Sequence, residues 1–447
     1  MAHLLNSAAE RATRYLEELD KRRVAPSADA MANLAKLDLT LPDRGLEPET
    51  VLDLLDEVGS PATIANAGGR YFGFVTGGAL PATLGANWLA GAWDQNAFSV
   101  TSSPVAAAIE AVALRWLLNV LRLPTDSAGA FVTGATMANF TGLAAARHAV
   151  LKRAGWDVEA DGLFGAPAIT VVVGAEAHTS LFKALGLLGL GRDRVVTMPT
   201  DGQGRMRADR LPEADGPMIV CVQAGNVNSG AFDPVAKVCE RVKEHNAWVH
   251  VDGAFGLWAA VAPERSHFTE GVDTADSWAT DAHKWLNVPY DSGLAFVRDD
   301  DALRAAMSVT AAYLPQGDQR EPFQFTPESS RRIRGVEIWA ALLSLGRNGL
   351  ADLVERCCRY AARFAQGLEN AGYQVLNNVE LNQALISFGD DETTRRVIAA
   401  LQADGSCWCG DTVWHGRAAM RISVASWATT ADDVEQSLTA MLRIAAE

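Results

Sequence analysis

The sequence predicts an α/β protein with a mostly parallel central sheet, an N-terminal helical arm and a small C-terminal α+β domain. The main observation is that short apolar runs alternate with helical patterns from residue 129 to residue 297, as in sheets covered by helices on both faces. Amphipathic helical patterns precede this region, and mixed helical and strand patterns follow it. We therefore expect an arm at residues 1–70, a large domain at 71–345 and a small domain at 346–447.

The strands of the large domain are predicted from six apolar runs. Each run is nearly continuous in apolar residues, which indicates a strand that is buried on both faces. The runs are Ala130–Thr133, Ile169–Val173, Val195–Met198, Met218–Val222, Ala247–Val251 and Ser292–Val297. Helical patterns separate these runs and supply the crossovers that parallel strands require.

The flanking segments carry helix signals. Apolar residues recur at helical spacing over Leu4–Lys21, and a second helix is predicted to begin after Pro48 and to end before Gly59. Thr430 and Asp433 have the spacing of a capping box at the start of a final helix. The small domain is also predicted to contain a long helical pattern after Gly335 and strands at Gly372–Val375 and Met420–Val424.

The composition indicates a soluble protein that acts on a small molecule. Of its 447 residues 49% are hydrophobic, and the formal charge is 39 − 54 = −15 without long blocks of like charge. Such a chain is a poor partner for nucleic acid or an acidic membrane surface. The N-terminus lacks the pattern of a secretory signal, and no run of about 20 apolar residues predicts a membrane span, so we expect a cytoplasmic protein. The six cysteines are expected to be structural thiols without a metal.

Two motifs suggest the chemistry. An apolar strand leads into His250–Ala254, which places the Asp252 carboxylate at the C-terminal edge of the sheet, where α/β proteins bind ligands. The run Asp281–Trp285 follows, and it contains Lys284. A lysine that forms an imine and an aspartate that pairs with a protonated ring nitrogen together suit a pyridine aldehyde cofactor. Taken singly, an aspartate in a turn and a solvated lysine are ordinary structural residues.

Two further segments follow predicted strands. In Phe131–Asn139 a strand, a small-residue turn and a helix succeed one another, which is typical of a phosphate site because N–H groups at a helix N-terminus bind anions. The run Val173–Ser180 places His178 just past a strand, where an imidazole could lie flat on a cofactor ring. Many α/β turns resemble the first segment, and a lone histidine more often packs or caps a helix.

In this order, the four segments resemble the group II pyridoxal-phosphate decarboxylases, which include aromatic-amino-acid, histidine, tyrosine and glutamate decarboxylases. The resemblance extends from about Tyr71 through Gly230–Pro234 to Arg421. It implies a fold-type I large domain like that of aspartate aminotransferase, with pyridoxal 5′-phosphate as the cofactor. It also implies an amino acid substrate and a homodimer whose active site lies at the interface.

The resemblance also implies roles for single residues. The predicted catalytic residues are Lys284, which forms the imine with the cofactor, Asp252, which holds the ring nitrogen, and His178, which stacks on the ring. The remaining predicted cofactor-binding residues are Ala254 beneath the ring, Ala135, Thr136 and His283 at the phosphate, and Asn228 in the segment where relatives carry a Thr-Thr pair.

The implied reaction is α-decarboxylation of an L-amino acid to its amine and CO₂. An aromatic or bulky apolar substrate is favoured by the aromatic residues Tyr71, Phe72, Phe74, Trp88 and Trp93, although packing in the core explains them equally well. Aromatic decarboxylases reprotonate the substrate carbon with a loop tyrosine, yet Gln316–Ser330 contains no tyrosine and Tyr313 lies just outside it. Because slow protonation exposes the carbanion to oxygen, decarboxylation with oxidative deamination to an aldehyde is an alternative. A dimeric pseudoenzyme scaffold is another.

Four arginines remain as weaker candidates. Arg331, Arg332 and Arg334 cluster where the large and small domains are predicted to meet. They could face a phosphate or a substrate carboxylate, or they could form a solvated basic face. Arg421 opens the last predicted strand and could bind the substrate carboxylate or cap the sheet.

Overall fold

The computed structural model describes residues 1–213, 215–309 and 320–447. The chain forms two compact units. The large unit comprises Ala79–Ala361 and Asn377–Gln383, and the small unit comprises Met1–Gly78, Ala362–Leu376 and Ala384–Glu447. The division into an arm and two domains at residues 70 and 345 stays a prediction.

Within the described residues, the large unit is built around a seven-stranded sheet. The spatial order is β1-β7-β6-β5-β4-β2-β3, and β7 runs antiparallel to both of its neighbours while the other pairs are parallel. The predicted mostly parallel sheet is therefore confirmed. The strands are β1 (Ala128–Val132), β2 (Thr170–Gly174), β3 (Val196–Met198), β4 (Met218–Gln223), β5 (Trp248–Asp252), β6 (Ser277–Asp281) and β7 (Gly293–Val297).

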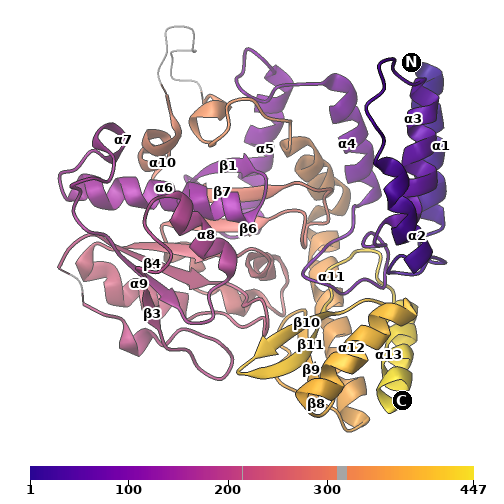
Figure 1. Ribbon diagram of the computed structural model, residues 1–447. Coiled ribbons are helices and arrows are strands. Elements are labelled where there is room, and N and C mark those ends of the chain that lie inside the picture. The colour runs from indigo at the N-terminus through magenta and orange to yellow at the C-terminus, as the bar shows by residue number, and fades with distance from the viewer. Residues whose placement is uncertain (214, 310–319) are drawn as a thin grey trace. The chain divides into compact units, whose positions relative to one another are not determined.

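Helices of the large unit pack against this sheet, with α6 and α8 lying over it in Figure 1. The helix α6 contacts β1, β4, β5, β6 and β7, so its inward face meets most of the sheet. The long helix α11 is interrupted at Gly346, whose φ of 59° is a left-handed value that favours glycine. The helices are α4 (Pro81–Trp93), α5 (Pro104–Val120), α6 (Ala135–Arg153), α7 (Val158–Asp161), α8 (Thr179–Leu187), α9 (Val235–Val242), α10 (Asp300–Met307) and the first part of α11 (Gly335–Asn370).

The predicted strands agree with the structure, with one omission. All six apolar runs form strands whose ends lie close to the predicted ones. The omitted strand is β6, which contains Ser277, Thr280 and Asp281 and so lacks a continuous apolar run, although all of its residues are buried. Its polar side chains are tolerated in the core because they are hydrogen-bonded there.

One edge of the sheet collects the C-terminal ends of six of the described strands. Because β1 and β6 are both antiparallel to β7, and β2, β3, β4, β5 and β6 are parallel, all six have their C-terminal ends at the same edge. We call this the carboxyl edge. The turn after β1 approaches β7 so closely that a Cβ on Gly293 would lie 2.4 Å from the Cα of Gly134. Glycine at position 293 therefore lets the start of α6 lie against the sheet.

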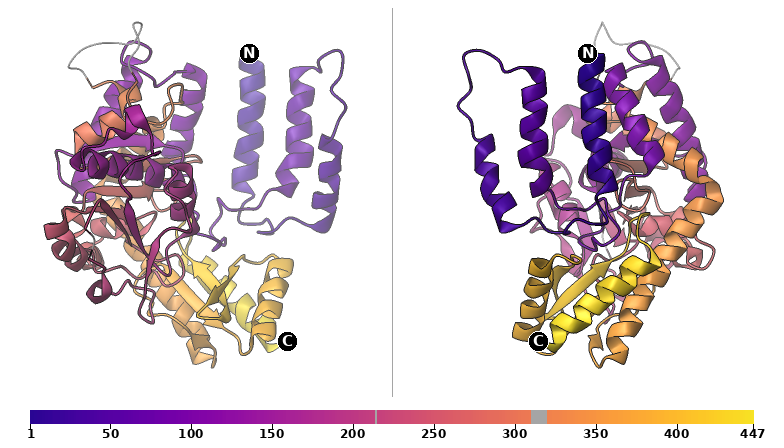
Figure 2. Two further views of the ribbon diagram at one scale, coloured as in Figure 1. Left: turned by 60° about the vertical axis from the view of Figure 1, so that its left-hand side comes forward. Right: turned by 90° about the vertical axis from the view of Figure 1, so that its right-hand side faces the viewer.

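The small unit contains a four-stranded sheet in the order β10-β11-β9-β8. The helices α1 and α3 run side by side (Figure 2). Between them Arg11 bonds Asp53 at 2.7 Å and Glu49 at 3.0 Å. Thr430 and Asp433 form the predicted capping box at the start of α13. The elements are α1 (Ala2–Glu17), α2 (Ala28–Asn33), α3 (Pro48–Leu54), β8 (Gln374–Val375), β9 (Gln383–Ser387), α12 (Asp391–Asp404), β10 (Gly410–Trp414), β11 (Arg417–Ser423) and α13 (Ala431–Ala446).

An aromatic stack lies within the small unit. The Trp408 ring stacks on Tyr71, with ring centroids 5.1 Å apart, and on Phe74 at 5.8 Å. The Phe72 N–H donates to the Trp408 carbonyl at 2.8 Å and fixes the register of the two segments. Phe74 is 62% exposed and has a φ of 56°, a left-handed value that is rare for a bulky residue. The stack therefore presents one aromatic ring to its surroundings.

Crossing a bilayer would require a longer and more apolar helix than any in the described part of the chain. All six cysteines are free thiols. Among the described residues, no three His, Cys, Asp or Glu side chains gather as a metal site would need.

Candidate active site

At the carboxyl edge, the Asp281 carboxylate contacts both Lys284 and the start of α6. The Lys284 Nζ lies 2.9 Å from Asp281 Oδ2, and the Ala135 N–H donates to Asp281 Oδ1 at 2.5 Å. Asp281 is the last residue of β6 and is 2% exposed, whereas the Lys284 side chain is 21% exposed. A buried carboxylate thus joins the candidate lysine to the N-terminus of a helix, which has a positive partial charge.

Asp252 is held by the same helix. Its Oδ2 accepts from Asn139 Nδ2 at 3.1 Å, and its Oδ1 accepts from the Ala254 N–H at 3.2 Å. Asn139 follows Ala135 by four residues, so both lie on one face of α6, about 6 Å apart along its axis. The helix α6 therefore bonds two carboxylates at the ends of neighbouring strands.

A buried chain of hydrogen bonds leads to Asp252 from the core. Trp248 Nε1 donates to Ser277 Oγ at 2.8 Å, which lies 2.8 Å from His250 Nδ1, and His250 Nε2 lies 2.9 Å from Asn139 Oδ1. Burial lowers the pKa of His250 to about 3, so the ring is neutral. Because the Asn139 amide turns its N–H toward Asp252, its oxygen accepts from His250 Nε2–H. Every donor in this series of hydrogen bonds points toward the Asp252 carboxylate.

His283 is fixed beside the lysine. Its ring stacks on Tyr290 at 4.3 Å, its Nδ1 accepts from the Ser292 N–H at 3.3 Å, and its Nε2 lies 3.7 Å from Asp281 Oδ2. Burial lowers the pKa of His283, and the Asp281 carboxylate partly opposes this shift. The imidazole is therefore neutral near pH 7.

His178 lies in the loop after β2 and caps α8. Its Nδ1 accepts from the Ser180 N–H at 3.2 Å. The carbonyl of Glu176 in the same loop accepts from Gln223 Nε2 at 3.0 Å and from Asn226 Nδ2 at 3.1 Å. The loop is thereby tied to the end of β4, which holds His178 at the carboxyl edge.

The other predicted residues lie at the same edge. Asn228 is buried in the loop after β4, where its N–H donates to Asn226 Oδ1 at 2.9 Å. The Ala254 carbonyl accepts from the Asp281 N–H at 2.9 Å and ties the ends of β5 and β6 together. Thr136 lies half-buried in the first turn of α6. All predicted site residues therefore follow strands that end at the carboxyl edge, while their roles stay predictions.

Sequence reasoning assigned no role to Asn139, Asp281 or Ser277, although the first two lie within the quoted motifs. A signal existed for Asn139, since it is one helical turn beyond Ala135 and so shares its face. Asp281 had no comparable signal, because its contacts with Lys284 and with α6 depend on how the helix docks on the sheet.

The arginine cluster does not form a solvated basic face. Arg331 makes two bonds to Glu110, at 2.6 and 2.7 Å, and both side chains are 1% exposed. Such a buried, doubly bonded pair has no spare charge for a phosphate or a substrate, so this expectation for Arg331 was wrong. Arg332 and Arg334 are paired with Glu337 and Asp291.

Two other predicted features stay predictions. Tyr313 and residues 316–319 of the tyrosine-free stretch lie outside the described residues. Arg421 is buried in β11 of the small unit, where burial lowers the pKa of its guanidinium.

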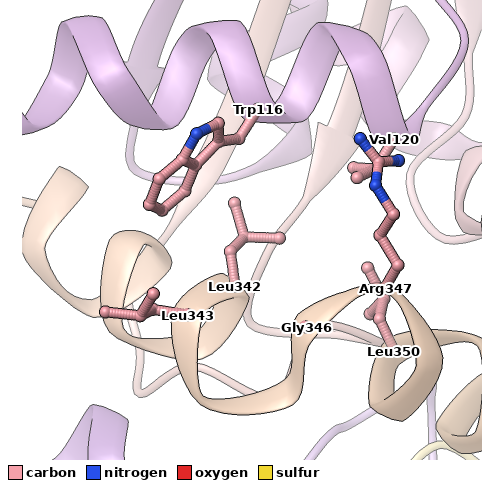
Figure 3. A pocket seen from close by; sticks show the side chains of 7 residues that line it. All are labelled: Trp116, Val120, Leu342, Leu343, Gly346, Arg347 and Leu350. Carbon is pink, nitrogen blue, oxygen red and sulfur yellow. The ribbon is translucent and has the colours of Figure 1, made fainter.

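A hollow of about 230 Å³ lies between α5 and α11. Figure 3 shows its mostly apolar side chains, and it contains none of the predicted site residues. Its lining comprises Trp116, Val120, Leu342, Leu343, Gly346, Arg347 and Leu350. The carboxyl edge, with its convergent polar groups, is the better candidate for chemistry.

The fold and the site define an α/β enzyme suited to a phosphorylated pyridine aldehyde. A lysine amine can bind an aldehyde, a carboxylate held by neutral donors can pair with a protonated ring nitrogen, and the start of α6 can bind a phosphate. The two contacts of α6 suit a small aromatic molecule with its nitrogen and its phosphate at opposite ends. The chain belongs to the pyridoxal-dependent decarboxylase family, whose conserved domain matches residues 37–389. It is a pyridoxal-phosphate-dependent amino acid decarboxylase.

Known relatives differ in their named substrates. Tryptophan decarboxylase 1 of Oryza sativa subsp. japonica is 27% identical over 398 residues, which cover 80% of this chain and 76% of that protein. The human acidic amino acid decarboxylase GADL1 is 28% identical over 334 residues, which cover 72% of this chain and 63% of that protein. A crystal structure of Oryza sativa TDC with PLP and tryptamine superposes with a TM-score of 0.93 at 23% identity and covers 100% of this chain and 97% of that one. This last likeness supports the fold.

Proposed function

We propose that this enzyme decarboxylates an L-amino acid with an aromatic or bulky apolar side chain, and that the carboxyl edge is its active site. The products are the amine and CO₂. The main support is that α6 bonds both carboxylates at this edge, Asp281 through the Ala135 N–H and Asp252 through the Asn139 side chain. In this proposal an amine, an anion site and a partner for the ring nitrogen lie within one small region.

In this proposal each candidate group has one task. Pyridoxal phosphate, when bound, supplies an electron sink for the pair left on Cα as CO₂ departs. Lys284 binds the aldehyde carbon through Nζ and can hold or return a proton there. Asp252 presents a charged oxygen to the ring nitrogen, and Asn139 and Ala254 keep that oxygen oriented.

The remaining groups position and shield the cofactor. The first turn of α6, with Ala135 and Thr136, would bind the phosphate together with His283. His178 and Ala254 would contact the ring, and Asn228 would close the loop side. The fixed, neutral His283 offers a hydrogen bond to an anion without adding a charge.

The aromatic stack of the small unit supports an aromatic substrate. Tyr71, Trp408 and Phe74 form a ladder that ends in an exposed ring, and exposed aromatic faces favour aromatic partners. The relative named tryptophan decarboxylase agrees with this choice, whereas the relative named for acidic amino acids favours another side chain.

Release of CO₂ from a panel of amino acids tests the proposal. The purified protein, loaded with pyridoxal phosphate, is incubated separately with each of the twenty amino acids and with DOPA. We expect the fastest CO₂ release from an aromatic or bulky apolar substrate, and none from Lys284→Ala. A preference for glutamate or aspartate would contradict the substrate class, and absence of CO₂ from every substrate would contradict the turnover.

A second outcome is favoured by one observation, the absence of tyrosine from Gln316–Ser330. Without a fast proton donor, oxygen can accept the electron pair, and the substrate, O₂ and water then yield an aldehyde, CO₂, ammonia and peroxide. The same assay separates the two reactions, because peroxide and ammonia equal to the CO₂ released indicate the oxidative reaction. A product that is entirely amine excludes it.

We also propose a homodimer with the active site at its interface, working in the cytoplasm. Large apolar side chains are exposed on helices and on the segment between α2 and α3, and monomeric proteins usually cover such surfaces. They include Leu5, Leu39, Leu41, Leu55, Trp88 and Leu89. Free cysteines agree with a reducing compartment. A mass of one chain in light scattering at micromolar concentration would contradict the dimer.

A further inference from the structure

The start of α6 already has an anion on it. Asp281 Oδ1 accepts the Ala135 N–H at 2.5 Å, and Asp281 Oδ2 lies 2.9 Å from Lys284 Nζ. The carboxylate is 2% exposed, so water screens it little. Asp281 therefore occupies one of the donors that the proposed phosphate requires, and it pairs with the amine that the proposed aldehyde requires.

The Asp281 carboxylate and a phosphate cannot both occupy the start of α6 without a loss in binding free energy. The inference rests on the proposed function, in which the phosphate binds at Ala135, Thr136 and His283. The nearest His283 nitrogen is 3.7 Å from the same Asp281 oxygen, and this neutral imidazole cannot offset a second negative charge. A Lys284 nitrogen that is engaged with the aldehyde would also no longer face Asp281 as a free ammonium. Like charges in a buried site repel strongly because the effective dielectric constant is low.

We propose that Asp281 is a built-in competitor of the cofactor's phosphate. Before the cofactor binds, Asp281 caps α6 and holds Lys284 at the carboxyl edge. Loading breaks both contacts, and the phosphate takes over the helix N-terminus. Asp281 thus positions the lysine and lowers the affinity of the site for a phosphorylated cofactor, which makes the cofactor exchangeable.

This proposal separates the effect on the phosphate from the effect on the lysine. Pyridoxal has the same aldehyde and ring as pyridoxal phosphate but lacks the phosphate. A substitution that acts only through Lys284 changes the affinity for both compounds alike. A substitution that relieves competition with the phosphate raises the affinity for pyridoxal phosphate alone, so the ratio of the two affinities is the informative quantity.

The experiment titrates the cofactor-free protein with each compound and follows the quenching of tryptophan fluorescence. The test variant is Asp281→Asn, which keeps an acceptor for the Ala135 N–H and removes the charge. The matched control is Asp276→Asn, because Asp276 precedes β6 at its other end and accepts the Val249 N–H at 2.7 Å. Asp281→Ala answers the same question if the first variant is unstable.

We expect Asp281→Asn to raise the affinity ratio of pyridoxal phosphate to pyridoxal by about tenfold or more, and Asp276→Asn to leave it within about twofold. An unchanged or lowered ratio in Asp281→Asn, in a protein whose parent binds both compounds, overturns this inference and leaves the proposed function intact. A parent protein that binds neither compound contradicts the proposed function as well.

Discussion

Asp252 and Asp281 occupy equivalent places and have different neighbours. Each is the last residue of its strand, the strands are adjacent and parallel, and the exposed fractions are 5% and 2%. The helix α6 bonds both, through Asn139 and Ala135. Position in the strand, burial and the contacting helix therefore do not distinguish the two carboxylates.

Their charge environments do distinguish them. The groups that bond Asp252 are neutral, an amide side chain and a backbone N–H, so its charge remains available for a cation that arrives from outside. Asp281 already faces the Lys284 ammonium. The comparison teaches that a carboxylate at the edge of a sheet acquires its role from the charge of its partners.

The largest expected effect follows from removing the amine that Asp281 holds. We expect Lys284→Ala to lower the rate of CO₂ release by at least about 10³-fold, because no other described group at the edge is placed to bind the aldehyde carbon. The visible absorbance of protein mixed with pyridoxal phosphate should also be lost. Lys183→Ala is the control, since Lys183 is an exposed lysine on α8. Equal loss in both variants would contradict the assignment.

The next effect tests the carboxylate that faces neutral donors. Asp252→Asn keeps the shape of the side chain and removes the charge that would stabilise a protonated ring nitrogen, so we expect kcat to fall by about 10²-fold to 10³-fold. The measurement is steady-state CO₂ release at saturating cofactor. Asp276→Asn controls for the loss of a half-buried carboxylate that accepts a backbone N–H, and a similar fall in that variant would show that stability rather than chemistry is affected.

Part of this contrast could be predicted from the sequence. The strands of the large unit other than β6 were predictable because burial on both faces requires continuous apolar runs. Asp252 was recognisable because its motif ends a predicted strand, and Lys284 because a His-Lys pair follows that motif along the chain. The strand β6 was not predictable, since Ser277, Thr280 and Asp281 interrupt its apolar character. Its polar groups are stable in the core through bonds to residues that are distant in the sequence.

The partners of the two aspartates could not be predicted in the same way. Whether Asn139 reaches Asp252 or Ala135 reaches Asp281 depends on the docking of α6 across the sheet, and this docking is set by many weak packing contacts. A sequence pattern gives the face of a helix but not its position along a strand. The two carboxylates therefore looked alike until their neighbours were known.

A smaller effect tests how Asp252 is oriented. Asn139→Ala removes the donor to Asp252 and the acceptor for His250 at once, which leaves two buried polar groups without these bonds. We expect a loss of about 3 kcal/mol in the free energy of unfolding. Denaturant unfolding of the cofactor-free protein measures it. A loss smaller than about 1 kcal/mol would mean that the chain of hydrogen bonds does not hold the carboxylate.

The smallest expected effect is a pH dependence of the free energy of unfolding. It arises from His250, at the inner end of the series of hydrogen bonds that leads to Asp252. Burial lowers the pKa of His250 to about 3, whereas an exposed histidine in the unfolded chain has a pKa of about 6.5. The unfolded state therefore binds a proton that the folded state excludes, and the stabilising contribution of neutral His250 is complete above pH 6.5 and is lost as the pH falls toward 3. Between pH 7 and pH 5.5 the loss is about 1 kcal/mol.

A variant is needed to isolate the contribution of His250, because the titration of Asp233 changes the free energy of unfolding in the opposite direction. Burial raises the pKa of Asp233 to about 6, so its folded state gains protons relative to the unfolded chain as the pH falls below 6. Subtracting the values for His250→Gln, which has no titrating ring, from those of the parent cancels Asp233 and other distant groups. The difference should shrink by about 1 kcal/mol from pH 7 to pH 5.5, and a constant difference would show that His250 is not held neutral by its burial.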